Sequence, residues 1–154
     1  MSLRIVAGLL LLSACSSATQ NRSAPMSGEV TGAVAPQMAV EQFLKAVHAR
    51  DLQGMSAVFG TSAGPARETM DRTELEKREI ILACYFNHDS FRILGESPWQ
   101  GGHRAIRVEL RKGNMIRQPT FYVIQGPGQR WYVDNMDIAA VRDFCGKGDA
   151  PPPR

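Results

Sequence analysis

The chain is poor in aromatic residues, in blocks of like charge and in the sequence motifs of nucleotide-binding and nucleophilic sites. Aromatic residues make up 7% of its 154 residues, and its charges are mixed in sign, with 18 Lys and Arg against 15 Asp and Glu. No block of five or six like charges occurs, so we expect no nucleic-acid binding. A phosphate-binding loop and a Cys-x-x-Cys pair are also absent, and we expect no nucleophilic or phosphoryl-transfer chemistry.

Long hydrophobic runs are missing as well. Residues 5–12 have no polar side chain and follow a single positive charge at Arg4, which is the pattern of a secretory signal. A permanent membrane-spanning helix needs about 20 apolar residues. The run therefore predicts export of the chain and not a transmembrane segment.

The segment that ends this run, Leu12-Ser13-Ala14-Cys15, resembles the bacterial lipobox. The resemblance implies that residues 1–14 are removed as a lipoprotein signal peptide and that Cys15 carries a diacylglycerol and further acyl chains such as palmitate. Each buried methylene contributes about 0.8 kcal/mol, so two or three chains would hold the protein to a bilayer stably. The alternative is an ordinary signal peptide cut nearby, which leaves Cys15 as a spare thiol.

Small and polar residues fill positions 15–36 and again 146–154. We predict a flexible tether in the first segment and a disordered tail in the second, with one folded domain over residues 37–145 between them. Ser16 and Ser17 stand where inner-membrane retention signals of the enterobacterial type usually place Asp. They favour the periplasmic face of the outer membrane.

Cysteine is scarce, with three residues in all. Assigning Cys15 to lipid leaves Cys84 and Cys145 in an oxidising compartment, where an even pair favours a disulfide. Closing a loop of about 60 residues would contribute roughly 4 kcal/mol. Two separately buried thiols remain an alternative, and we expect no metal and no cofactor.

Hydrophobic periodicity divides the domain into a helical half and a strand half. Apolar residues at helical spacing predict a helix over 37–50, and Asp51 is placed to cap a short second helix. Residues 60–70 are predicted to be a loop. Thr73 with Glu76 forms a capping-box pattern that predicts the start of a third helix.

The second half alternates with period two. Strands are predicted at 90–95, 105–110, 115–124 and 130–133, with a Gly113-Asn114 hairpin turn, and a loose helical turn at 138–145. In the second of these strands the inward set is Ile106, Val108 and Leu110, and the outward set is Arg107, Glu109 and Arg111. The predicted class is α+β, with helices packed on a curved antiparallel four-stranded meander.

Residues 39–47, the following Asp51-Leu52 turn and the closing 130–134 strand resemble the nuclear transport factor 2-like (NTF2-like) superfamily, a cystatin-like cone. Small periplasmic lipoproteins of unknown function resemble the chain best. The resemblance implies a pocket between the sheet and the helices. Catalytic members often carry a hairpin after the second helix, and here only residues 60–70 are available for it.

Candidate pocket residues follow from this resemblance, and they are Tyr85, His88, Asp89, Arg104, Tyr122, Tyr132 and Asp134. Asp89 is expected mainly to cap or turn the chain. Arg104 is expected to pair with Asp134 or Glu79, or else to bind a carboxylate ligand. Trp99 lies in a Gly/Pro loop, where it could fold back onto the domain or anchor a partner. We assign no catalytic residue.

Two functions stay open. The first is a non-enzymatic, membrane-anchored envelope lipoprotein, monomeric or dimeric, whose domain binds a protein partner or a small apolar ligand. The second is an acid-base enzyme of the isomerase or dehydratase kind that uses a pocket Asp and a Tyr.

Overall fold

The computed structural model describes residues 30–146, in which helices precede an antiparallel sheet. The helices are α1 (Pro36–Ala49), α2 (Leu52–Val58), α3 (Ala66–Thr69) and α4 (Arg72–Tyr85). The strands are β1 (Gly60–Thr61), β2 (Gly64–Pro65), β3 (Ser90–Pro98), β4 (Arg104–Lys112), β5 (Met115–Arg117), β6 (Thr120–Gln125) and β7 (Trp131–Met136). This order confirms the α+β class. The predicted signal peptide, Cys15, most of the predicted tether and residues 147–154 lie outside the described residues.

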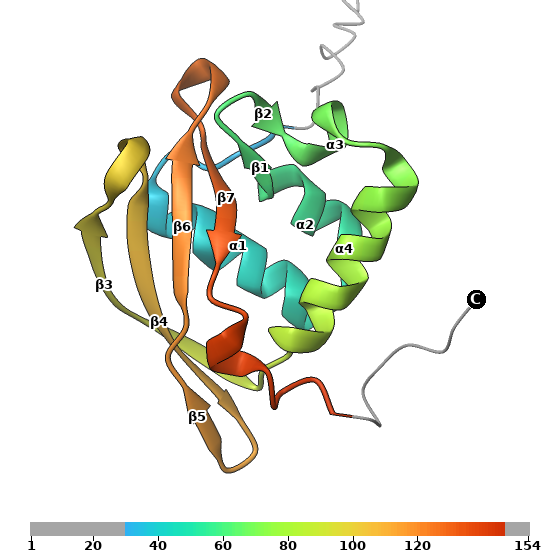
Figure 1. Cartoon of the computed structure of the whole chain (residues 1–154), viewed down its shortest axis with the longest axis vertical. Helices are drawn as coiled ribbons and strands as arrows, with labels where there is room; N and C mark the ends of the chain where they lie inside the picture. The colour runs from blue at the N-terminus through green and yellow to red at the C-terminus, as the bar shows by residue number, and fades with distance from the viewer. Residues whose placement is uncertain (1–29, 147–154) are drawn as a thin grey trace, which may run out of the picture.

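The long helix α1 packs across one face of the sheet (Figure 1). Its apolar stripe, the basis of the predicted helix, is buried at Ala39, Val40, Phe43, Leu44 and Val47. Inward residues of β4 and β6 meet this stripe. Ile106, Val108, Leu110, Phe121 and Val123 are fully buried, so the core lies between α1 and the sheet.

Two aspartates cap the helices that follow. Asp51 accepts a hydrogen bond from the Gly54 N–H at 2.9 Å, which confirms it as the cap of α2. The predicted capping box is wrong. Asp71 caps α4 by accepting from the N–H groups of Thr73 and Glu74, so Thr73 lies inside the first turn of the helix.

The segment predicted as a loop over 60–70 holds the β1–β2 hairpin and the short helix α3. Strands of two residues are too short to produce an alternating pattern, which is why the sequence did not reveal them. Gly60 is required here because a Cβ would collide with the Gly64 carbonyl oxygen. The hairpin therefore occupies the place after α2 where the predicted family often has one.

The large sheet is ordered β3-β4-β6-β7, with β5 paired to the far end of β4. The single strand predicted over 115–124 is interrupted at Gln118-Pro119. Proline has no N–H to donate to a neighbouring strand, so Pro119 only accepts, from the Val108 N–H at 3.1 Å, and regular pairing resumes at Thr120. The Gly113-Asn114 turn lies between β4 and β5, as expected.

The folded domain begins earlier than residue 37. Ala33 is fully buried and pairs with Trp131 through two backbone hydrogen bonds of 2.9 and 2.8 Å. The Arg130 guanidinium donates to the carbonyls of Thr31 and Gly32. Residues 31–33 are thus tied to the edge of the sheet beside β7 through one bridge and the Arg130 side chain, and the predicted tether loses its last residues to the fold.

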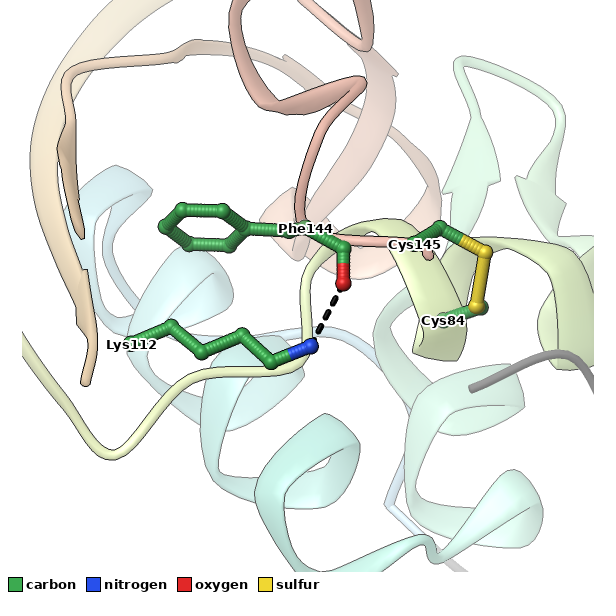
Figure 2. The surroundings of a disulfide bond; sticks show 4 residues. All are labelled: Cys84, Lys112, Phe144 and Cys145. Carbon is green, nitrogen blue, oxygen red and sulfur yellow. Dashed lines mark hydrogen bonds between the residues drawn. A yellow bond between two sulfur atoms is a disulfide. The ribbon is translucent and has the colours of Figure 1, made fainter. Parts of the chain in front are cut away.

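Cys84 and Cys145 form the predicted disulfide, with their Cα atoms 5.1 Å apart and a sequence separation of 61. The bond fastens the segment after β7 to the last turn of α4 (Figure 2). Beside it, Phe144 is fully buried and its carbonyl accepts from Lys112 Nζ at 2.5 Å. The C-terminal segment is therefore held by a covalent bond, an apolar side chain and a hydrogen bond.

One outward residue of β4 is buried all the same. Glu109 is 7% exposed because the guanidinium groups of Arg92 and Arg111 lie over its carboxylate at 3.3 and 2.8 Å. The hydrogen bond from Arg111 is the main reason why the pKa of Glu109 lies below its ordinary value. The outer face of the sheet here carries a charged cluster in which the two arginines stay exposed to solvent and cover the glutamate.

Candidate functional site

Three of the predicted residues gather in one groove at the end of the sheet. Trp99, Tyr122 and Asp134 line an open groove of about 680 Å³, with Gln100, Gly101, His103 and Asn135 completing its walls. The residues come from the β3–β4 connection, from β6 and from β7. Sequence reasoning predicted these three residues without predicting that they meet.

Trp99 folds back onto the domain, which is one of the two roles expected for it. Its ring lies 5.2 Å from the Tyr122 ring at an angle of 46°, so it packs back on the sheet. Half of its surface nevertheless stays exposed. The Trp99 N–H donates to the His103 carbonyl at 2.8 Å and closes the loop that presents the indole. A second hollow on the other side of this ring pair is lined by Ser97, Arg107 and Thr120, among others.

His103 and Asp134 form the most polar contact in the groove. The His103 Nε2 lies 2.6 Å from the Asp134 carboxylate, and both side chains are about one quarter exposed. Asp134 is the extra residue of a β-bulge, since Tyr122 pairs with Asn135 while Val123 pairs with Val133. A bulge re-aims a side chain, and no sequence signal marks it. The sequence could not foresee this pair.

The geometry of His103 limits what it can do. Its other ring nitrogen, Nδ1, lies 3.2 Å from the Gln100 carbonyl oxygen. Both nitrogens therefore face acceptors, and neither directs a lone pair into the groove. His103 holds the loop and Asp134 in place and is not positioned as a general base.

The remaining predicted residues lie elsewhere. His88 is 3% exposed, its Nδ1 lies 2.8 Å from the Phe86 carbonyl oxygen, and burial lowers its pKa. Asp89 accepts a hydrogen bond from the Gly113 N–H at 2.7 Å and so contacts the turn between β4 and β5. Tyr85 packs against the hydrophobic core. His88 is a buried structural histidine, so these three residues form no site with the groove.

The predicted partners of Arg104 are wrong. Its Nε donates to Glu96 at 2.8 Å, because Glu96 on the neighbouring strand shares its face of the sheet. Asp134 is already held by His103, and Glu79 lies in the helical layer. The pair Arg104–Glu96 is structural, and Gln37 also donates to Glu96 at 3.1 Å.

One motif escaped the sequence analysis. Gly60-Thr61-Ser62-Ala63-Gly64 fits the Gly-x-Ser-x-Gly pattern of hydrolases, in which the serine stands on a sharp turn between a strand and a helix. Here Ser62 lies at the exposed tip of the β1–β2 hairpin. Among residues 30–146 no hydrogen bond or ion pair links it to a histidine, so the match carries no catalytic geometry.

A separate pocket of about 350 Å³ lies between α2, α3 and α4. Glu79 forms part of its wall, is 3% exposed, and has an Oε1 atom without a hydrogen-bond partner in the described structure. Burial, followed by the negative charges of Glu76 and Asp51, raises the pKa of Glu79 to about 7. The sequence pattern suggests Glu79 only as a partner for Arg104.

None of the helices within residues 30–146 combines the length and apolar character needed to cross a membrane. Comparison of the chain with protein-family models, with curated proteins and with solved structures finds no match. The groove around Trp99 and the pocket beside Glu79 are therefore the features that bear on function.

Proposed function

We propose that this protein is a bacterial envelope lipoprotein, anchored by an acylated Cys15 to the periplasmic face of the outer membrane. We further propose that its domain is an NTF2-like cone that serves as a non-catalytic module and binds a protein partner through the Trp99 groove. The lipobox resemblance supports the anchor. The order of helices, hairpin and curved antiparallel sheet supports the NTF2-like assignment.

The exposed indole of Trp99 is the observation that carries the binding proposal. Tryptophan and tyrosine supply much of the binding energy at protein interfaces, because they bury a large apolar area and lose little conformational freedom. Trp99 is half exposed, yet its packing on Tyr122 and its backbone bond to His103 fix its position. A pre-positioned aromatic anchor lowers the entropic cost of association.

A protein partner fits this groove better than a small apolar ligand. The groove is open, and its walls include His103, Asp134 and Asn135 beside the two aromatic rings. The layer between α1 and the sheet, where the family resemblance would place a ligand, is filled by the buried rings of Phe43, Phe86 and Phe121. An aromatic centre with a polar rim is typical of protein interfaces.

The acid-base enzyme is the second candidate, and one observation favours it. Asp134 and Tyr122, an Asp and a Tyr of the kind it requires, line the same groove. Asp134 is engaged by His103 at 2.6 Å in a groove open to water, whereas an efficient carboxylate base is held in an apolar cavity. We therefore place the enzyme second.

The binding proposal is tested by photo-crosslinking in the intact envelope. A photoreactive phenylalanine analogue is placed at the exposed Gln100, and a matched control carries it at Ile116 on β5, which is 45% exposed. We expect a discrete crosslinked protein from position 100 only, and its loss on Trp99→Ala while the variant still unfolds cooperatively. Equal crosslinking from both positions, or a product insensitive to Trp99→Ala, would refute the proposal.

A further inference from the structure

The pocket between α2, α3 and α4 lies away from the Trp99 groove and is independent of the function proposed for it. The three helices gather on the side of the molecule opposite β3 (Figure 1). The cavity measures about 350 Å³, which is near the lower end of the range for small-molecule sites. Its size favours a ligand of a few heavy atoms.

Glu79 is the feature that points to a ligand. Glu79 belongs to the wall of the pocket and is only 3% exposed. Its Oε1 atom has no hydrogen-bond partner in the described structure. Buried carboxylate oxygens are almost always hydrogen-bonded, because leaving one unsatisfied costs its full desolvation penalty. Because Glu79 belongs to the wall of the pocket, a ligand that brings a hydrogen-bond donor would match its carboxylate.

The charges around the pocket suggest what else such a ligand carries. Arg67 of α3 and Arg72 and Glu76 of α4 line the same cavity, and Asp51, the cap of α2, is close enough to affect Glu79 electrostatically. The α2 wall adds Ser56, whose hydroxyl donates to the Gln53 carbonyl at 2.9 Å. Acidic and basic groups therefore share one small cavity, which matches a molecule with a charge of each sign.

We infer that this pocket binds a small amino acid or related amino-carboxylate, with its ammonium group donating to the Glu79 carboxylate and its carboxylate facing Arg72. Charge-assisted hydrogen bonds are stronger than neutral ones, and arginine is well suited to carboxylates. An amine alone or a carboxylic acid alone would satisfy only one end of the site.

The inference also fixes the direction of the pH dependence. An ammonium group binds the ionised form of Glu79, and the pKa of that carboxyl in the free protein is about 7. The charged groups facing it are Asp51 from α2, Arg67 from α3, and Arg72 and Glu76 from α4. Binding should therefore tighten by about tenfold between about pH 6 and pH 8.

The test uses the purified full chain in a non-ionic detergent. The probes are the common amino acids and the unbranched ω-amino acids from glycine to 6-aminohexanoate, screened by thermal shift and then measured by titration calorimetry. We expect at least one probe to bind, and its amine-only and acid-only analogues to bind about tenfold more weakly or less. No shift with any probe at millimolar concentration would overturn the inference.

Two variants assign the binding to the pocket. Glu79→Gln should weaken binding about tenfold or more and abolish its pH dependence, whereas Glu74→Gln on the exposed side of α4 should leave both unchanged. Arg72→Gln should weaken the amino acid but not its amine-only analogue. Binding that survives Glu79→Gln would contradict the inference. Trp99→Ala should have no effect, which separates this site from the groove.

Discussion

Replacing Glu79 with glutamine should change how the stability of the domain depends on pH. The carboxyl is buried, and burial raises its pKa to about 7 from the ordinary value of 4.5. Between these two values the folded chain holds a proton that the unfolded chain has released. Stability is then highest below the unfolded pKa and falls as the pH rises through the folded pKa.

The size of the effect follows from the shift. Each pKa unit corresponds to about 1.4 kcal/mol. The shift from 4.5 to about 7 therefore lowers the free energy of unfolding by about 3 kcal/mol in total as the pH rises, and by roughly 2 kcal/mol between about pH 5 and pH 8. Glutamine has no proton to lose. The free energy of unfolding of Glu79→Gln, relative to the wild type, should therefore rise by that amount across the same range.

Urea unfolding followed by tryptophan fluorescence, at several pH values, measures this difference. Glu74→Gln is the matched control, because Glu74 lies on the same helix and pairs with Arg78 at 3.5 Å while both side chains are 55% exposed. An exposed pair of this kind contributes little, so the control should follow the wild type at every pH. If the free energies of unfolding of Glu79→Gln and the wild type differed by the same amount at every pH, the raised pKa of Glu79 would be refuted.

Three further changes test the fold. Reducing the bond between Cys84 and Cys145 should lower the free energy of unfolding by about 4 kcal/mol, and reductant should not affect a Cys84→Ser/Cys145→Ser double variant. The pKa of His88 lies below its ordinary value of 6.5 in the folded chain. The free energy of unfolding should therefore decline as the pH falls below about 6.5, because the unfolded chain takes up the proton first. His88→Asn should remove that decline. Gly32→Ala should lower the melting temperature more than Gly113→Ala. Both glycines have positive φ, but only a Cβ at position 32 would meet other atoms, 2.7 Å from Arg130. Equal decreases in melting temperature would argue against the docking of residues 31–35.

The parts of the fold that were predictable depend on local pattern. The stripe of α1 and the alternation of β4 each bury apolar side chains on one face, and such spacing is visible in the sequence. Asp51 could be assigned as a cap because an aspartate directly preceded a helical stretch. Cys84 and Cys145 could be paired once Cys15 was set aside.

The features that the sequence did not predict depend mostly on contacts between distant segments. The groove exists because a bulge at Asp134 brings that carboxylate to His103, 31 residues earlier, and nothing local encodes the pairing. Glu79 looks like an ordinary helical glutamate until α2 and α3 cover it. The β1–β2 hairpin has too few residues to show a period. Long-range geometry, and not residue type, made these features.

Acylation of Cys15 is the central claim about where this domain acts, and one measurement addresses it directly. Cells expressing the full chain are grown with an alkynyl palmitate analogue, and the protein is isolated from the membrane fraction. We expect label on the wild type, an N-terminal peptide that begins at a Cys15 bearing two or three acyl chains, and no label on Cys15→Ala. A wild-type chain with an unmodified Cys15, or label that persists in Cys15→Ala, would contradict the account.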